Sequence, residues 1–439
     1  MSSNKKYWKS EAELSANDAM IETLKQNEFV EQIPTGEFLS DKQTLATSNT
    51  NRRDFLKYVG FSTAAASLAA CEGPVIKSIP YVVQPEQIIP GVANFYATTI
   101  ANGFDFASIL VKTREGRPIK VENNKDAQVK GTANARVQAS ILSLYDSARL
   151  QGPLFNGAPS EWSDLDAAVV SALANAKASG KKVVFLTPTY ASPSMSKLVA
   201  EFAQGQDQVS HVVYDAISES AALDAFEAVT GERALADYHL EKASVIVSFG
   251  ADFLGDWQGG GFDAGYAKGR IPSAGQMSQH FQFESNMTLS GAAADKRVPS
   301  NSAQQAQALA ALYEIVTTGA TSVALPENIM AAVKAAAKAV VKAGDNAVVL
   351  TGIDSVEAQS LVLDLNASLE SVAFDMEAPR YVRGGSDKAL QSLVAEMSAG
   401  GVGLLVIDGV NPVYSLPNAA EFKAALSNVG TTVAFSTMP

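Results

Sequence analysis

The residue with the clearest chemical role in this sequence is Cys71, the only cysteine among 439 residues. It closes the box Leu68-Ala69-Ala70-Cys71, whose small side chains are those that a lipoprotein signal peptidase needs before a cysteine that becomes acylated. Upstream lies a twin arginine followed by Phe-Leu-Lys and a weakly apolar, Ala- and Ser-rich segment, which is typical of a bacterial Tat export signal. The pattern predicts lipidation of Cys71 and an export signal formed by Arg52, Arg53, Phe55 and Leu56.

A buried amphipathic helix that begins at Asp54 is the alternative interpretation of this segment, with the two arginines solvated before it. It explains neither the arginine pair nor the position of the cysteine. A single cysteine also excludes an internal disulfide and a Cys-ligated iron–sulfur cluster built from this chain alone. Because one acyl chain anchors weakly, stable attachment needs the two or three chains that a bacterial lipoprotein cysteine normally carries.

The histidines and serines show no spacing that marks a metal site or a nucleophile. The three histidines are far apart in sequence and form no His-x-x-His or His-Glu-x-x-His motif, so ordinary hydrogen-bonded histidines are expected. The serines considered lack the Gly-x-Ser-x-Gly elbow of a nucleophile. We therefore predict no catalytic, cofactor-binding or metal-ligating residue; the side chains weighed are His211, His239, His280, Ser108, Ser192 and Ser290.

Two loops have the composition of ligand-binding loops. Gly250-Ala251-Asp252-Phe253, with Gly259-Gly260-Gly261 just beyond it, follows an apolar strand candidate, and Gly409-Val410-Asn411-Pro412 follows another. Loops at the carboxyl ends of parallel strands face the crevice in which α/β sheets bind ligands. Neither loop has the Lys-Ser/Thr of a P-loop or the spacing of a dinucleotide fingerprint, so a structural role is favoured. We expect Phe253, Trp257 and Phe262 to fill part of the crevice.

The composition is that of a globular protein, with 47% hydrophobic and 18% charged residues. A formal net charge of −12 argues against a nucleic-acid partner, which needs clustered Lys and Arg. No stretch beyond the signal approaches the ~18 consecutive apolar residues of a spanning helix. The body is therefore expected to be tethered to a membrane, not inserted in it.

Helical periods alternate with short apolar strands beyond Trp162, which predicts parallel sheets covered by helices on both faces. Before them, a hairpin with Arg114-Glu115-Gly116-Arg117 in its turn indicates a small β-rich cap. The fold class is thus α/β, with a β-rich N-terminal cap followed by doubly wound parallel-sheet domains. The predicted strands are 182–186, 209–214, 243–249, 280–283, 347–350, 371–374, 402–407 and 432–435, and the predicted helices are 164–178, 194–204, 303–316 and 328–343.

These patterns suggest five segments. They are a signal and leader (1–70), a Pro-rich tether (71–91), the cap (92–155), an α/β domain (156–325) and a second α/β domain (326–439). Because a strand near Pro439 has no closing helix, we expect the second domain to be truncated or to continue in a partner.

Segment 94–131 resembles the small iron–sulfur module of molybdopterin oxidoreductases, including a hairpin turn that continues as Val121-Glu122-Asn123-Asn124. The family's cysteine positions fall in Phe95–Ile100 and Asn134–Gln138, which contain no sulfur. Leu144-Tyr145-Asp146 resembles the family's entry into its α/β domains, and Gly409–Tyr414 resembles an Asn-Pro loop of its third domain. The degenerate cap implies that the cluster of that module is absent.

The leader resembles more specifically the B subunits of bacterial alternative complex III, through Lys6-Tyr7-Trp8-Lys9-Ser10, the twin arginine, the cysteine box and Ile79-Pro80-Tyr81-Val82. This resemblance implies a cofactor-less, molybdopterin-oxidoreductase-like half, with iron–sulfur clusters only in a C-terminal half that is missing here. It implies a scaffold in a respiratory quinol oxidoreductase that passes electrons to cytochrome c or a terminal oxidase. Implied partners are a multihaem cytochrome c and quinol-binding membrane subunits, at the periplasmic face of the inner membrane. The alternative is a molybdenum oxidoreductase that binds the pterin without the N-terminal cluster.

Overall fold

The computed structural model describes residues 88, 89, 91–128, 133–272 and 277–438. Contacts divide the chain into Met1–Gln84 and Pro85–Pro439, and the fold below is that of the second unit. The predicted export residues Arg52, Arg53, Phe55 and Leu56, the lipidation site Cys71 and nearly all of the tether lie outside the described residues.

The cap is a three-stranded antiparallel sheet in the order β1 (Asn94–Asn102), β2 (Asp105–Arg114) and β3 (Arg117–Asn123). Glu115 and Gly116, in the turn between β2 and β3, have φ of 50° and 77°. Two successive positive φ angles suit the right-handed twist of a hairpin, so the predicted hairpin is confirmed. A small core of Ala107, Ile109, Val121 and Val137 joins this sheet to α4 (Ala135–Ala139) and the 3₁₀ turn η3 (Ser140–Leu144). The short hairpin β4 (Leu154–Phe155) and β5 (Ala158–Pro159) follows.

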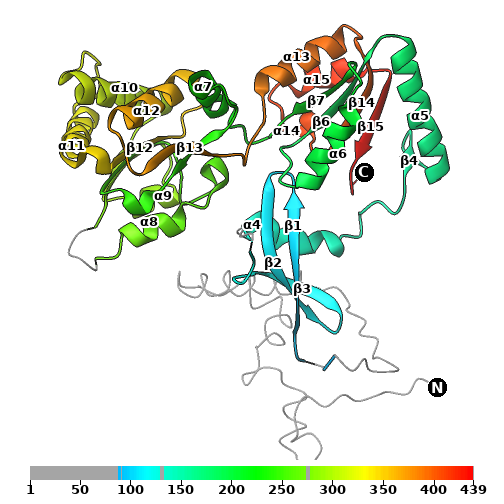
Figure 1. The fold of residues 1–439 in the computed structure, drawn as a ribbon, viewed down its shortest axis with the longest axis horizontal. Helices are drawn as coiled ribbons and strands as arrows, with labels where there is room; N and C mark the ends of the chain where they lie inside the picture. Colours follow the sequence, from blue (N-terminus) through cyan, green and yellow to red (C-terminus); the bar gives the residue numbers. More distant parts are fainter. Residues whose placement is uncertain (1–87, 90, 129–132, 273–276, 439) are drawn as a thin grey trace, which may run out of the picture. The chain divides into compact units, whose positions relative to one another are not determined.

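Two four-stranded parallel sheets form the rest of the described chain (Figure 1). Sheet I has the order β11 (Lys296–Pro299), β10 (Gln279–Glu284), β9 (Val245–Phe249) and β12 (Ala347–Thr351). Sheet II has the order β15 (Thr431–Phe435), β14 (Val402–Asp408), β6 (Lys182–Thr187) and β7 (Val209–Val213). The predicted α/β class with parallel sheets is confirmed.

Alternate side chains of each central strand enter different cores, which explains why the strands read as continuous apolar runs. In sheet I, Val247 and Phe249 pack against α10 (Ser302–Thr318), α11 (Glu327–Ala343) and α12 (Val356–Ser368). Ile246 faces α7 (Ser220–Thr230) and α8 (Asp263–Gly269) instead. In sheet II, Leu405 packs against α13 (Asp387–Ser398) and α15 (Ala419–Leu426), and Val406 packs against α5 (Trp162–Ala178). The shorter helices are α6 (Pro193–Ala203), α9 (Leu289–Ala293) and α14 (Pro412–Ser415), with 3₁₀ turns at Leu240–Lys242, Trp257–Gly259 and Gly344–Asn346.

The sheets do not follow the predicted boundary between residues 325 and 326. β12 pairs with β9, and β14 pairs with β6, so each sheet takes strands from both predicted domains. The chain leaves sheet II after β7, builds sheet I, and returns to add β14 and β15. A two-stranded antiparallel ribbon of β8 (Leu235–Tyr238) and β13 (Phe374–Arg380) lies at the ends of this insertion. Strand patterns do not encode partners far along the chain, which is why the boundary was misplaced.

One predicted strand also needs correction. Residues 371–374 were expected to join a parallel sheet, but Phe374 begins β13, which is antiparallel to β8. Ser371 donates a hydrogen bond from Oγ to the carbonyl of Ala347 at 2.5 Å, just outside the end of sheet I. Within the described part of the chain, no helix is long and apolar enough to span a bilayer.

Candidate functional site

The two glycine-containing loops lie where they were predicted, at the carboxyl ends of β9 and β14. In the first loop, Phe253, Trp257 and Phe262 are all buried. The Phe253 ring lies 5.4 Å from that of Tyr266 and 5.1 Å from that of His280, and Trp257 donates from Nε1 to the Thr351 carbonyl at 3.2 Å. Side chains of the protein itself therefore fill the space behind this loop, as predicted.

The glycines beside these aromatics are required by contacts within the protein. A Cβ added to Gly250 would lie 2.6 Å from Oε1 of Gln305, and one added to Gly352 would lie 2.5 Å from the Gly250 carbonyl oxygen. Real Cβ atoms essentially never lie this close, so a side chain at Gly250 would displace Gln305 and one at Gly352 would displace the backbone of the Gly250 loop. Gly250 also has φ of 72°, which disfavours other residues. Close approach of two loops explains these glycines without a bound phosphate.

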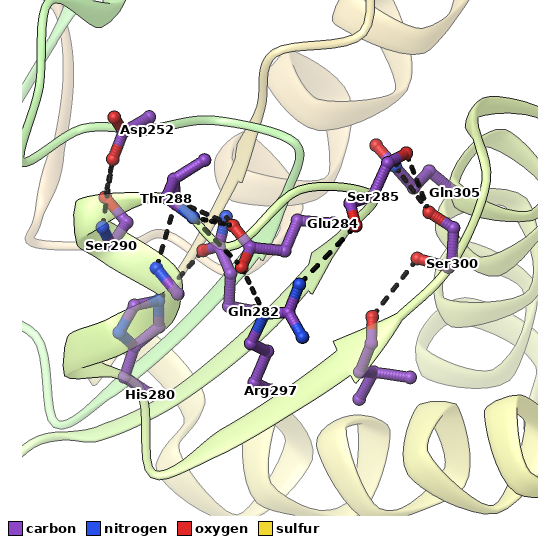
Figure 2. Close-up of polar contacts among 12 residues, drawn as sticks. Asp252, His280, Gln282, Glu284, Ser285, Thr288, Ser290, Arg297, Ser300 and Gln305 are labelled. Atoms are coloured by element: carbon purple, nitrogen blue, oxygen red, sulfur yellow. Dashed lines mark hydrogen bonds and ion pairs between the residues drawn. The ribbon is translucent and has the colours of Figure 1, made fainter. Parts of the chain in front are cut away.

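At the carboxyl end of β10, a buried carboxylate organises a hydrogen-bond network (Figure 2). Glu284 accepts hydrogen bonds from Nε of Arg297 at 2.5 Å and from Oγ1 of Thr288 at 2.6 Å. Ser290 donates from Oγ to Asp252 at 2.8 Å, and the same oxygen accepts from the Leu254 amide. Since Ser290 is fully buried and both of its hydrogen-bonding roles are taken, this pair fastens α9 to the Gly250 loop and does not present a nucleophile.

The three histidines do not form a common site. His280 is fully buried between Tyr266 and Gln282, with hydrogen bonds of 3.2 and 3.1 Å, and burial lowers its pKa to about 4. His211 shares a 2.8 Å hydrogen bond with Thr187, and burial also lowers its pKa. His239 lies 3.8 Å from Asp375. Among the described residues, no group of three His, Cys, Asp or Glu side chains is placed to hold a metal ion.

The remaining weighed residues have local structural roles. Ser192 caps α6, and Asn411 caps α14 by accepting from the Tyr414 amide at 3.2 Å. Ser108 is buried in β2. The Gly409 loop therefore begins a short helix, as an Asn-Pro turn does elsewhere.

A charged cluster that sequence reasoning missed lies around Arg383, and we call it the Arg383 cluster. It consists of Phe104, Asp105, Arg136, Glu219, Asp256, Gln258 and Arg383. The Arg383 guanidinium carbon lies 3.5 Å from the centre of the Phe104 ring, and the residue is only 3% exposed. Arg136 donates hydrogen bonds of 2.6 and 2.8 Å to Asp105 and one of 2.7 Å to Asp256. These bonds connect the cap to the Gly250 loop.

Burial and hydrogen bonds compete in setting the pKa values of this cluster, and burial prevails at Glu219 and Arg383. Burial raises the pKa of Glu219, although the Gln258 backbone amide donates a 3.1 Å hydrogen bond to that carboxyl group. Burial lowers the pKa of Arg383, and the nearby carboxylates of Asp215 and Asp256, which raise that pKa, only partly offset this effect. Burial alone would raise the pKa of Asp105, but hydrogen bonds from Arg136 and Asn134 outweigh it and lower that pKa.

Some polar atoms near this cluster have no partner within the described residues. They include Oε1 of Gln258, Nε of Arg383 and Nη1 of Arg380. Gln258 also has φ of 48°, which is uncommon for a residue with a side chain. The only sequence signal for this centre is Arg383-Gly384-Gly385 after a strand, where a Cβ on Gly385 would lie 3.0 Å from Asp215. This pattern matches no functional motif, so the cluster could not be predicted from the sequence.

The residues of the cap and of the Gly250 loop fit an iron–sulfur cluster and a pterin cofactor to different degrees. The cap contains no cysteine, so it does not fit a Cys-ligated cluster. The Gly250 loop packs over Phe253 and Trp257, but Gly261 and Phe262 at its far end line a pocket of about 330 Å³ together with Arg380. The polar features that a ligand could use are the unpartnered atoms of the Arg383 cluster and this pocket, where Nη1 of Arg380 also has no partner among the described residues.

The fold, with its two parallel sheets, is similar to that of a solved enzyme. Acetylene hydratase from Pelobacter acetylenicus matches with a TM-score of 0.54 and 9% identity, over 76% of this chain and 59% of that one. In sequence, the chain is 24% identical over 445 residues to the menaquinone reductase, molybdopterin-binding-like subunit of Nitratidesulfovibrio vulgaris. That alignment covers 88% of this chain and 63% of the relative, so the chain spans less than two thirds of its length. No protein-family model matches. The comparisons confirm the resemblance to molybdopterin-oxidoreductase-like proteins and fit the narrower resemblance to alternative complex III B subunits.

Proposed function

We propose that this chain is a non-catalytic scaffold in a membrane respiratory quinol oxidoreductase of the alternative complex III type. The relative named as a molybdopterin-binding-like subunit of menaquinone reductase supports a place in a quinone-linked complex. The observation that carries the non-catalytic role is the filled crevice edge, where Phe253, Trp257 and Phe262 are buried behind the Gly250 loop. An enzyme of this fold needs an open pocket with convergent reactive groups at this edge.

The polar groups at the same edge support this proposal. Asp252, Ser290 and Glu284 all bond to neighbouring backbone or side chains, which holds loops in place and leaves no reactive pair exposed. The chain is thus proposed to hold no cofactor, and iron–sulfur clusters are expected only in a C-terminal half that is not part of this sequence. Electron transfer to cytochrome c or a terminal oxidase would be carried by other parts of the complex.

The alternative, a pterin-binding molybdenum oxidoreductase without the N-terminal cluster, has one observation in its favour. Gln258 and Arg383 are almost completely buried, and each has a side-chain atom without a partner in the described region. Such atoms often bind an ordered water or a ligand. The charges around them are mostly carboxylates, which disfavours an anionic pterin phosphate at this position.

Metal and pterin analysis of the purified complex separates the two functions. The scaffold function predicts no molybdenum, tungsten or released pterin in proportion to this chain. A stoichiometric signal that Arg383→Gln abolishes would overturn the scaffold and establish the oxidoreductase. An α11 variant, Lys338→Gln, is the control because its side chain is exposed and distant in sequence.

The proposed location is the periplasmic face of the inner membrane, after Tat export and acylation of Cys71. The proposed partners are a multihaem cytochrome c and quinol-binding membrane subunits. Replacing Arg52 and Arg53 by Lys should leave precursor in the cytoplasm, as measured by fractionation. Cys71→Ser should yield a protein without lipid by mass spectrometry; mature, lipid-bearing Cys71→Ser protein would refute the anchor assignment. Membrane retention alone does not decide this, since partner subunits could hold the variant.

A further inference from the structure

The cap differs in charge from the rest of the chain. Residues 88–150 contain eight Lys and Arg against five Asp and Glu, whereas residues 151–439 contain 17 against 30. The cap is therefore a basic module on an acidic body. Several of its cations lie at the end of the sheet formed by the β2–β3 turn, namely Lys112, Arg114, Arg117 and Lys120.

Strand register places these cations next to an exposed aromatic ring. Phe95 is directly opposite Lys112, which in turn is opposite Lys120, so the three side chains lie in one row across the sheet. Their neighbours in sequence, Val111 and Val121, pack on the other face of the sheet. The Lys112 ammonium lies 5.6 Å from the centre of the Phe95 ring, which is half exposed. We call this row, together with Arg114 and Arg117, the basic tip.

The basic tip is at the free end of the cap. Contacts with the α/β part of the chain are made at the opposite, β1–β2 end, where Gly103 accepts from the Ala191 amide at 2.8 Å and Arg136, which binds Asp105, donates to Asp256 at 2.7 Å. β2 spans ten residues, which separates the two ends by about 30 Å at 3.4 Å per residue. Figure 1 shows the β2–β3 end of the cap pointing away from α6.

We propose that the basic tip docks on anionic phospholipid head groups. Exposed cations beside an aromatic ring match a negatively charged interface, where rings sit at head-group level and cations gain electrostatic attraction. This inference rests on the membrane location given under the proposed function, but not on the absence of catalysis. Only 22 residues separate Cys71 from Asn94, so an acylated chain would hold the tip near the bilayer and make a weak contact effective.

Vesicle flotation tests the proposal. The chain carrying Cys71→Ser, which has no acyl anchor, is mixed with vesicles of phosphatidylcholine alone or with 30% phosphatidylglycerol by amount. We expect flotation with the anionic vesicles only, and loss of binding at high salt because charge is screened. Replacing Arg114, Arg117 and Lys120 by Gln should weaken binding on the order of 25- to 100-fold, at about fivefold per cation, because Lys120 already forms a 3.5 Å ion pair with Glu122.

A matched control removes the same charge elsewhere. Lys334, Lys338 and Lys342 are exposed on α11, and their replacement by Gln should leave binding unchanged. Circular dichroism melting of each variant checks that the cap is folded. Equal binding of parent and tip variant, or equal binding to both vesicle types, overturns the proposal. Failure of the parent to float with anionic vesicles, together with loss of co-purifying subunits from the tip variant, also overturns the proposal and assigns the tip to an acidic protein surface. A finding of bound pterin would refute the scaffold function without changing the flotation result.

Discussion

The Phe253→Ala substitution tests whether protein packing fills the crevice edge. Phe253 is fully buried and its ring contacts those of Tyr266 and His280. Truncating a buried Phe to Ala destabilises a protein by about 3–5 kcal/mol, since apolar contacts are lost and a cavity remains. This range already includes the loss of the ring contacts with Tyr266 and His280. For a unit of this size each kcal/mol lowers the melting temperature by roughly 2–4 °C, so a decrease of roughly 10 °C is expected.

Thermal unfolding followed by near-ultraviolet circular dichroism and by calorimetry measures this decrease. Val341→Ala on α11 is the control, because Val341 is 60% exposed and its truncation should lower the melting temperature by less than 2 °C, corresponding to about 0.5 kcal/mol for a surface change. A Phe253→Ala protein that melts like the control would refute the packing argument. That result would mean that the loop lines open space, as it would in a ligand-binding relative.

Two further predictions concern charge. Burial lowers the pKa of His280 to about 4, so below about pH 6.5 the unfolded chain binds a proton that the folded chain does not. The free energy of unfolding should therefore fall by ~3 kcal/mol in total as pH drops from about 6.5 to 4, and His280→Gln should flatten that profile. Arg136→Gln should destabilise the cap by about 1–3 kcal/mol, since Asp105 is left buried without its cation, and Arg136→Lys should restore only part of this because it loses the two-point grip. Limited proteolysis between the cap and α5 measures the second effect, and unchanged cleavage rates in Arg136→Gln would contradict it.

Local patterns in the sequence were sufficient to predict elements and the loops that follow them. The runs at Val402 and Ala347 are apolar at every position because helices cover both faces of their sheets, so length and flanking glycines identify them as strands. Partner choice was not predictable, because β6 pairs with β14 across more than 200 residues. Antiparallel β13 was partly missed for a similar reason, since its seven residues are only half buried and carry polar side chains.

The candidate site divides in the same way. The burial of Phe253, Trp257 and Phe262 was predictable because large apolar side chains that follow a buried strand are stabilised by packing beside it. The Arg383 cluster was not, because Phe104, Arg136, Glu219 and Arg383 come from four separate segments that only the tertiary fold brings together. Isolated arginines and glutamates are usually solvated, and no spacing distinguishes the few that are buried.

The glycine-rich loop is a weak indicator of function in this fold, and the reason is structural. Gly250 and Gly352 are fixed by the approach of two backbones and a glutamine side chain, so they would be retained whether or not a ligand binds. Arg383 has the opposite property, because its unpartnered Nε and its burial destabilise the protein unless something compensates them. Substitutions at Phe253 and Arg383 therefore report on different things. A scaffold should lose stability at Phe253 and change little or gain at Arg383→Met, whereas a ligand-binding enzyme should lose its ligand at Arg383 and depend less on Phe253.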